Sequence, residues 1–226
     1  TVTGVQTCAL PISPSNYCIA GLLPSYLERK GSSLVYMTRD LIEKSGNPDS
    51  GFFLNQFESL RDLIIKNETS GTPTLLLGVT YALLDFAEKF PMPLKHTIVM
   101  ETGGMKGRRK EMIREEVHAK LKESFSINEI HSEYGMTELL SQAYSKGEGN
   151  FLTPPWMKIL IREANDSNEI LVQKQSGAIN VIDLANIHSC CFIATSDLGK
   201  INSDGSFSVL GRMDNSDVRG CNLMIG

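Results

Sequence analysis

Residues 74–89 carry the sequence TLLLGVTYALLDFAEK, and this stretch decides the fold. Its first part, 74–78, is a short apolar run that predicts a buried strand. In 79–89 apolar residues recur three and four positions apart, which predicts an amphipathic helix that stops before Pro91 and Pro93. A buried strand running directly into a helix indicates an α/β unit with a parallel sheet.

The same alternation continues on both sides of this stretch. Towards the N-terminus the pattern predicts a strand at 17–23 and helices at 33–44 and 56–66. Towards the C-terminus it predicts a strand at 96–101 and a long charged helix at 108–124. We therefore expect an α/β fold in which a mostly parallel sheet has helices on both faces.

The pattern changes after Gly149, where shorter β-type runs are separated by Asn, Asp, Ser and Gly. These runs are 156–162, 169–174, 178–183 and 190–195, followed by a hairpin turn at Asp204-Gly205 and a strand at 206–210. They predict a β-rich antiparallel subdomain packed on the α/β part. We accordingly divide the chain into an α/β part, 14–150, and a β-rich subdomain, 151–226.

The N-terminal segment is expected to be foreign to the protein. Residues 2–12, VTGVQTCALPI, match the in-frame translation of a widely used sequencing-library adapter. We expect 1–13 to be an assembly artefact, with the genuine start of the protein upstream. The alternative is a natural loop of the same sequence, and sequencing reads across Ser13 distinguish the two.

Composition favours an enzyme of the cytoplasm. With 226 residues, 41% of them hydrophobic, the chain can bury a large core. A net charge of −4 gives no electrostatic case for a nucleic-acid partner. The sequence contains no run of about eighteen apolar residues, so no membrane-spanning helix is predicted. The cysteines and histidines show no metal-ligand spacing, so free thiols in a reducing cytoplasm are expected.

Residues 131–139, HSEYGMTEL, place an aromatic ring, a hydroxyl and a carboxylate around Gly135. A strand at 127–130 and a helix at 138–144 are predicted on either side, and a strand-to-helix turn of this kind favours phosphate. Tyr134 would stack on a base, Thr137 would bond an α-phosphate and Glu138 would hold Mg²⁺. The alternative is an ordinary capped helix.

Two later motifs support a nucleotide site. TSDLG, 195–199, follows the apolar run 190–194, and a carboxylate at such a strand end, Asp197, can bind the two hydroxyls of a ribose. Arg212 comes just after the next predicted strand. In this order, Y-G-M-T-E, T-S-D-L-G and G-R-x-D resemble the core motifs of the adenylate-forming acyl ligases, so the chain is expected to be part of the large domain of such an enzyme.

Three further segments narrow the resemblance to the LuxE-type acyl-protein synthetases: LPSYLE at 23–28, ETGGMKGRR at 101–109 and GRMDNSDVRGCN at 211–222. The resemblance runs from about residue 17 to the last residue. It implies ATP and Mg²⁺ as cofactors, a fatty acid as substrate, and an acyl-transferring or reductase protein as partner. The residues implied at the nucleotide are Gly103 and Gly104 in a turn beside adenine, Tyr134 at adenine, Gly135 and Met136 elsewhere in the cofactor site, Thr137 at the phosphate, Glu138 on Mg²⁺, Asp197 on the ribose, and Arg212 at the ribose or phosphate.

The resemblance also implies the chemistry. A long-chain fatty acid would be activated as an acyl-adenylate and transferred to a cysteine near the C-terminus, here Cys221. A small buried residue at a tight turn is the structural alternative for Cys221. Delivery to coenzyme A and a non-catalytic relative remain as alternative functions. Because the phosphate loop of such enzymes is not found in this sequence, we expect the fragment to be inactive and the loop to be encoded about 30 to 60 residues before Tyr17.

Overall fold

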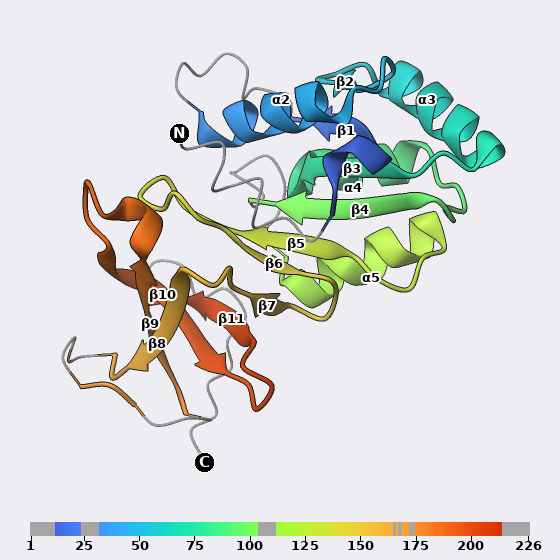
Figure 1. Cartoon of the computed structure of the whole chain (residues 1–226). Coiled ribbons are helices and arrows are strands. Elements are labelled where there is room, and N and C mark those ends of the chain that lie inside the picture. The colour runs from blue at the N-terminus through green and yellow to red at the C-terminus, as the bar shows by residue number, and fades with distance from the viewer. Residues whose placement is uncertain are drawn as a thin grey trace.

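The computed structural model describes residues 12–23, 32–103, 112–164, 166, 169–171 and 175–213. In these residues one continuous sheet of eleven strands carries helices on both faces (Figure 1). The strands are β1 Cys18–Leu22, β2 Gly51–Phe52, β3 Thr74–Val79, β4 Thr97–Thr102, β5 His131–Tyr134, β6 Ala143–Ser145, β7 Asn150–Leu152, β8 Met157–Arg162, β9 Ser176–Asp183, β10 Phe192–Ile201 and β11 Phe207–Arg212. The helices are η1 Pro14–Asn16, α2 Ser33–Ser45, α3 Phe57–Ser70, α4 Thr80–Lys89, α5 Arg114–Phe125 and η2 Leu184–Asn186.

The first half of the sheet is parallel, in the order β2-β1-β3-β4-β5. All six residues of β3 are buried, and Leu76 lies between Ala20 of β1 and Val99 of β4 in the ladder. Helix α4 then begins at Thr80. The prediction that the stretch 74–89 forms a strand followed by a helix is confirmed.

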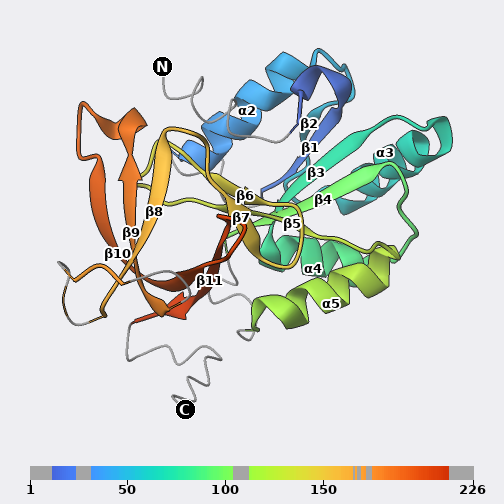
Figure 2. The same ribbon diagram turned by 60° about the horizontal axis from the view of Figure 1, so that its bottom comes forward.

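Helices cover both faces of the parallel half (Figure 2). On one face α3, α4 and α5 bury Leu60, Phe86 and Phe125 against the sheet. On the other face α2 packs through Met37 and Leu41. This is the doubly covered sheet that the alternation predicted. Within the described ranges, each helix is too short or too polar to cross a bilayer.

The second half of the sheet is antiparallel, in the order β5-β6-β7-β11-β10-β9-β8. It has a core of its own, formed around Phe151, Ile179 and Phe207. The β-rich antiparallel part is therefore confirmed. Strand direction nevertheless reverses earlier than the pattern change at Gly149 suggested, because β6 already pairs antiparallel with β5, with Ser145 opposite Ser132.

Some predicted elements are wrong in place or kind. The strand expected at 127–130 is instead the connection that follows α5, where the Ile127 N–H donates to the Lys122 carbonyl, and the strand begins at His131. The strand expected at 169–174 is reduced, in its described residues, to one bridge between Ile170 and Arg162. The helix expected at 108–124 begins at Arg114; residues 104–111 lie outside the described residues.

The helix predicted at 138–144 is also wrong, because side chains of the antiparallel half bind its backbone. The Asn186 side chain accepts from the Leu140 N–H at 2.8 Å and donates to the Glu138 carbonyl at 2.6 Å. Asp183 accepts from the N–H and hydroxyl of Ser141, at 2.9 and 2.7 Å. These groups therefore have partners outside any helical ladder, and the segment is a loop that leads into β6.

Asp183→Ala is expected to lower the free energy of unfolding by about 2–4 kcal/mol. Asp183 is fully buried and also accepts from the Ala185 N–H at 3.0 Å, so the substitution leaves three donors without an acceptor. Urea unfolding would measure the loss. Asp62→Ala, at an exposed surface pair with Arg61, is the matched control and should change stability by no more than about 0.5 kcal/mol. Equal effects of the two substitutions would contradict the inference that the hydrogen bonds of Asp183 stabilise the loop that leads into β6.

Candidate nucleotide site

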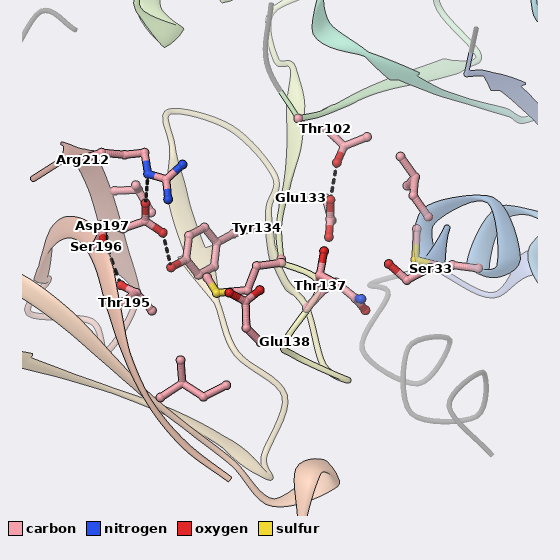
Figure 3. A pocket seen from close by; sticks show the side chains of 18 of the residues that line it. Ser33, Thr102, Glu133, Tyr134, Thr137, Glu138, Thr195, Ser196, Asp197 and Arg212 are labelled. Carbon is pink, nitrogen blue, oxygen red and sulfur yellow. Dashed lines mark hydrogen bonds and ion pairs between the residues drawn. The ribbon is translucent and has the colours of Figure 1, made fainter. Parts of the chain in front are cut away.

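A cavity of about 970 Å³ lies where the sheet changes from parallel to antiparallel (Figure 3). It is lined by the ends of β4 and β5, the loop after β5, the start of α2, and the facing residues of β10 and β11. The carboxyl ends of parallel strands at such a change of direction are where α/β sheets bind ligands. Of the residues predicted at the nucleotide, this cavity is lined by Gly103, Tyr134, Gly135, Met136, Thr137, Glu138, Asp197 and Arg212.

One side of the cavity is built from three strands, of which β5 is more than fifty residues away from β10 and β11 in the sequence. The Tyr134 hydroxyl, from β5, donates to Asp197 Oδ2 of β10 at 2.8 Å. Arg212, which ends β11, places its Nε 3.4 Å from Asp197 Oδ1. The Asp197 N–H in turn donates to the Thr195 hydroxyl at 3.1 Å. Asp197 is thus held in one orientation, with an arginine beside it (Figure 3).

Tyr134 is more buried than a residue free to stack on a base. Only 8% of it is exposed, because Phe207 and Phe151 pack against its ring with centroids 5.4 and 5.9 Å away. Burial, with the neighbouring Asp197 charge, raises the pKa of Tyr134 above its usual value, so its hydroxyl stays a donor to that carboxylate. The stacking of Tyr134 on adenine stays a prediction, and its contact with Asp197 was not foreseen.

The loop after β5 offers the hydroxyl and carboxylate of the motif to the cavity. Thr137 and Glu138 are both exposed and line it, whereas Met136 is partly buried against the core of the antiparallel half. No described group of three or more acidic, histidine or cysteine side chains could hold a metal by itself. A single carboxylate still fits Mg²⁺, which commonly takes one or two carboxylates together with substrate phosphates.

Gly103 directly follows β4 and has a φ of 77°, a left-handed conformation that favours glycine. Its backbone lines the cavity without a side chain in the way, as a close approach to a ligand requires. The other two predicted site residues, Gly104 and Cys221, lie outside the described residues.

Sequence reasoning missed Glu133, which lines the cavity from the strand position before Tyr134. It accepts a hydrogen bond from the Thr102 hydroxyl at the end of β4. Burial raises the pKa of the Glu133 carboxyl to about 7, nearby Glu101 adds to the rise, and the Thr102 hydroxyl opposes it. A charged residue inside a short strand was the available signal.

Glu133→Gln is expected to flatten the pH dependence of stability between pH 4.5 and 7. The carboxyl binds its proton more tightly in the folded chain than at its ordinary value of 4.5, so this group favours folding most below pH 4.5 and loses that advantage as pH rises to about 7. The loss should be on the order of 2–3 kcal/mol. Urea unfolding at several pH values would measure it. An unchanged slope in the variant would show that Glu133 does not carry the shift.

A cluster of buried polar side chains connects the ends of β4 and β5. Glu101 accepts from the Thr80 hydroxyl at 2.9 Å and lies 3.7 Å from Nε2 of His118. That same nitrogen is 3.3 Å from the Ser132 hydroxyl. Because these residues come from β4, α4, α5 and β5, their contacts fix the strand ends that carry the cavity.

The apolar runs 190–195 and 17–23 predict that Cys190, Cys191 and Cys18 are buried. This is wrong for the pair: Cys190 is exposed and Cys191 half-buried, because they precede β10 and the strand's own first residue, Phe192, is 67% exposed. The burial of Cys18 is confirmed. None of the three lines the cavity.

A scan against protein-family models and a search of curated proteins found no match to the sequence. Solved structures do match. ATP-bound MatB from Rhodopseudomonas palustris is similar with a TM-score of 0.66 at 15% identity, over 93% of this chain and 42% of MatB. Coronafacic acid ligase from Pectobacterium brasiliense has a TM-score of 0.60 at 16% identity, over 93% and 42% of the two chains. O-succinylbenzoate coenzyme A synthetase (MenE) from Bacillus subtilis, in complex with AMP, has a TM-score of 0.58 at 18% identity, over 95% and 44%.

The chain spans less than half the length of these proteins. At such identities the likeness concerns the fold. In this chain that fold is a parallel sheet that continues into an antiparallel one, with the cavity where the two meet. The chain therefore has the fold of part of the large domain of an adenylate-forming ligase.

Proposed function

We propose that the protein activates a long-chain fatty acid with ATP and transfers the acyl group to a protein cysteine. The observation that carries this proposal is the meeting of Thr137, Glu138, Asp197 and Arg212 in one cavity. Thr137 and Glu138 come from the loop after β5, and Asp197 and Arg212 come from two strands more than fifty residues further along the chain. A hydroxyl, two carboxylates and a guanidinium in this arrangement can bind the ribose, the phosphates and the metal ion of a ribonucleoside triphosphate.

Each of these residues has a separate role in the first step, the formation of the acyl-adenylate. Asp197, oriented by Tyr134, accepts the two ribose hydroxyls, and Arg212 adds a positive charge beside them. Thr137 donates to the α-phosphate. Glu138 would hold Mg²⁺, whose charge would offset the negative charge that develops at the phosphates. Positioning and electrostatics are the main contributions of the protein.

The chemistry balances as two displacements. A carboxylate oxygen of the fatty acid attacks the α-phosphorus, the bond to the β-phosphate oxygen breaks, and pyrophosphate leaves. A thiolate then attacks the acyl carbonyl, and AMP leaves with the electron pair of the mixed anhydride. We assign the thiolate to Cys221 from the family resemblance. Delivery to coenzyme A is the second candidate, favoured by the structural likeness to a coenzyme A synthetase.

Exchange of labelled pyrophosphate into ATP tests the activation step, using the protein expressed from its complete reading frame. We expect exchange that depends on added fatty acid. Asp197→Ala should raise the KM for ATP by about 30-fold or more, because it removes a charged acceptor of the ribose hydroxyls. The control Asp62→Ala, at an exposed pair on α3, should not change it. No exchange with any carboxylic acid, from a protein that is folded, would refute the proposal.

A further inference from the structure

The cavity has a second polar side that the nucleotide residues do not use. Asp197, Tyr134 and Arg212 form one side, and Thr102 and Glu133 form the other (Figure 3). Ser33 and Met37, from α2, line the cavity as well. If the ribose lies at Asp197 and the α-phosphate at Thr137, the attacking acid must approach from beyond the phosphate. The side formed by Thr102 and Glu133 is then left for the body of the acid.

Two side chains on this second side are close neighbours. A Cβ placed on Gly135 would lie 2.5 Å from Glu133 Oε1 and 2.9 Å from Gln142 Cγ. Both side chains therefore lie against the same point of the loop backbone, and only glycine leaves them room. Gln142 lines the cavity from the segment that precedes β6.

The side-chain carbonyl oxygen of Gln142 lacks a hydrogen-bond donor. Only 5% of the residue is exposed, and its buried Oε1 has no hydrogen-bond partner among the described residues. A buried acceptor without a donor costs free energy that a ligand can recover by supplying one. Glu133 has a single described donor, the Thr102 hydroxyl, and a carboxylate can accept several.

An acceptor-rich wall of this kind does not suit an alkyl chain. Hydrocarbon placed against this wall would leave Gln142 Oε1 without a donor and the Glu133 carboxyl with the Thr102 hydroxyl as its single described donor. An N–H or O–H group on the ligand would supply the missing donor, and an ammonium group would in addition pair with the Glu133 carboxyl and favour its ionised form, which burial and the neighbouring Glu101 otherwise disfavour.

We propose that Glu133 and Gln142 form a polar subsite for the acid substrate, which selects a carboxylic acid that carries a hydrogen-bond donor, an amine or a hydroxyl, on its chain. This inference rests on the proposed function, since it assigns the second side of the cavity to the acid. It narrows that function from unsubstituted fatty acids to amino- or hydroxy-substituted acids.

A matched panel of acids tests the inference with the complete protein. Linear acids from butyrate to octadecanoate would each be offered as the plain acid, the ω-hydroxy acid and the ω-amino acid in pyrophosphate exchange. At the chain length that fits best, a donor-bearing acid should have a kcat/KM at least about 10-fold above the plain acid. A preference for plain acids at every length would overturn the subsite and leave the proposed activation intact. If none of the acids supported exchange, both the subsite and the proposed activation would be refuted.

Two substitutions separate the acid from the nucleotide. Glu133→Gln and Gln142→Met should each reduce the preference for the donor-bearing acid by about 10-fold while the KM for ATP stays within about twofold. Glu43→Gln, an exposed residue of α2, is the matched control and should leave the preference unchanged. Thermal unfolding would verify that each variant is folded, and the acid panel on the unsubstituted protein decides the question if one is not. An increased KM for ATP with an unchanged acid preference would show that these side chains face the nucleotide base, and would overturn the proposal.

Discussion

Glu138→Gln is expected to reduce fatty-acid-dependent exchange of pyrophosphate into ATP by about two orders of magnitude, the scale for loss of a charge-stabilising group. The Glu138 side chain is exposed and lines the cavity, while its backbone carbonyl is held by Asn186. The substitution therefore removes one negative charge at the proposed metal position and leaves the loop attached to the sheet. The unfolding free energy should be unchanged.

The magnesium dependence of the same variant sharpens this test. If Glu138 holds Mg²⁺, Glu138→Gln should need a higher magnesium concentration for half-maximal exchange, whereas Glu43→Gln on the exposed face of α2 should not. Exchange near the normal rate in Glu138→Gln, with unchanged magnesium dependence, would remove this residue from the metal role.

The parallel half of the sheet could be predicted from sequence because its signals are local. The buried run of β3 and the apolar spacing of α4 are sufficient to specify a strand and a helix, and both formed within one residue of the predicted limits. The same holds for α2, predicted at 33–44. In these elements intrinsic pattern and tertiary packing favour the same conformation.

The loop after β5 could not be predicted, because its conformation depends on residues more than forty positions away. Leu140 and Tyr144 lie four positions apart, which is the spacing of one helix face, yet Asn186 and Asp183 bind the backbone N–H groups of Leu140 and Ser141. Nothing within 138–144 signals those bonds. The motif was placed correctly at the end of a parallel strand, but the structure that follows it is a loop and an antiparallel strand.

The site shows the same division. The motif residues Thr137, Glu138, Asp197 and Arg212 do share one cavity, as their order in the sequence suggested, although their roles stay predictions. Glu133 carried one sequence signal, a charge inside a short strand, and Gln142 carried none, since neither spacing nor residue type shows that both lie against Gly135. Only packing brings a carboxyl and an amide to the same wall of the cavity.

Cys221→Ser is expected to abolish hydroxylamine-sensitive labelling of the protein by radioactive fatty acid and ATP while pyrophosphate exchange continues. Cys221 lies nine residues after Arg212 in the sequence and two after Arg219, and an arginine near a thiol favours the reactive thiolate. A serine hydroxyl at the same position is a far weaker nucleophile towards the acyl-adenylate and forms an ester in place of a thioester.

The other cysteines provide the control for this experiment. Cys18 is fully buried, whereas Cys190 is exposed and is therefore the thiol most open to unspecific acylation among the described residues. Cys190→Ser should keep full labelling, and Cys221→Ser should lose it. Equal labelling of both variants would show that Cys221 is not the acceptor. If no variant is labelled but exchange proceeds and coenzyme A consumes the adenylate, the acyl group goes to coenzyme A, because the activation step then works without any thiol of the chain.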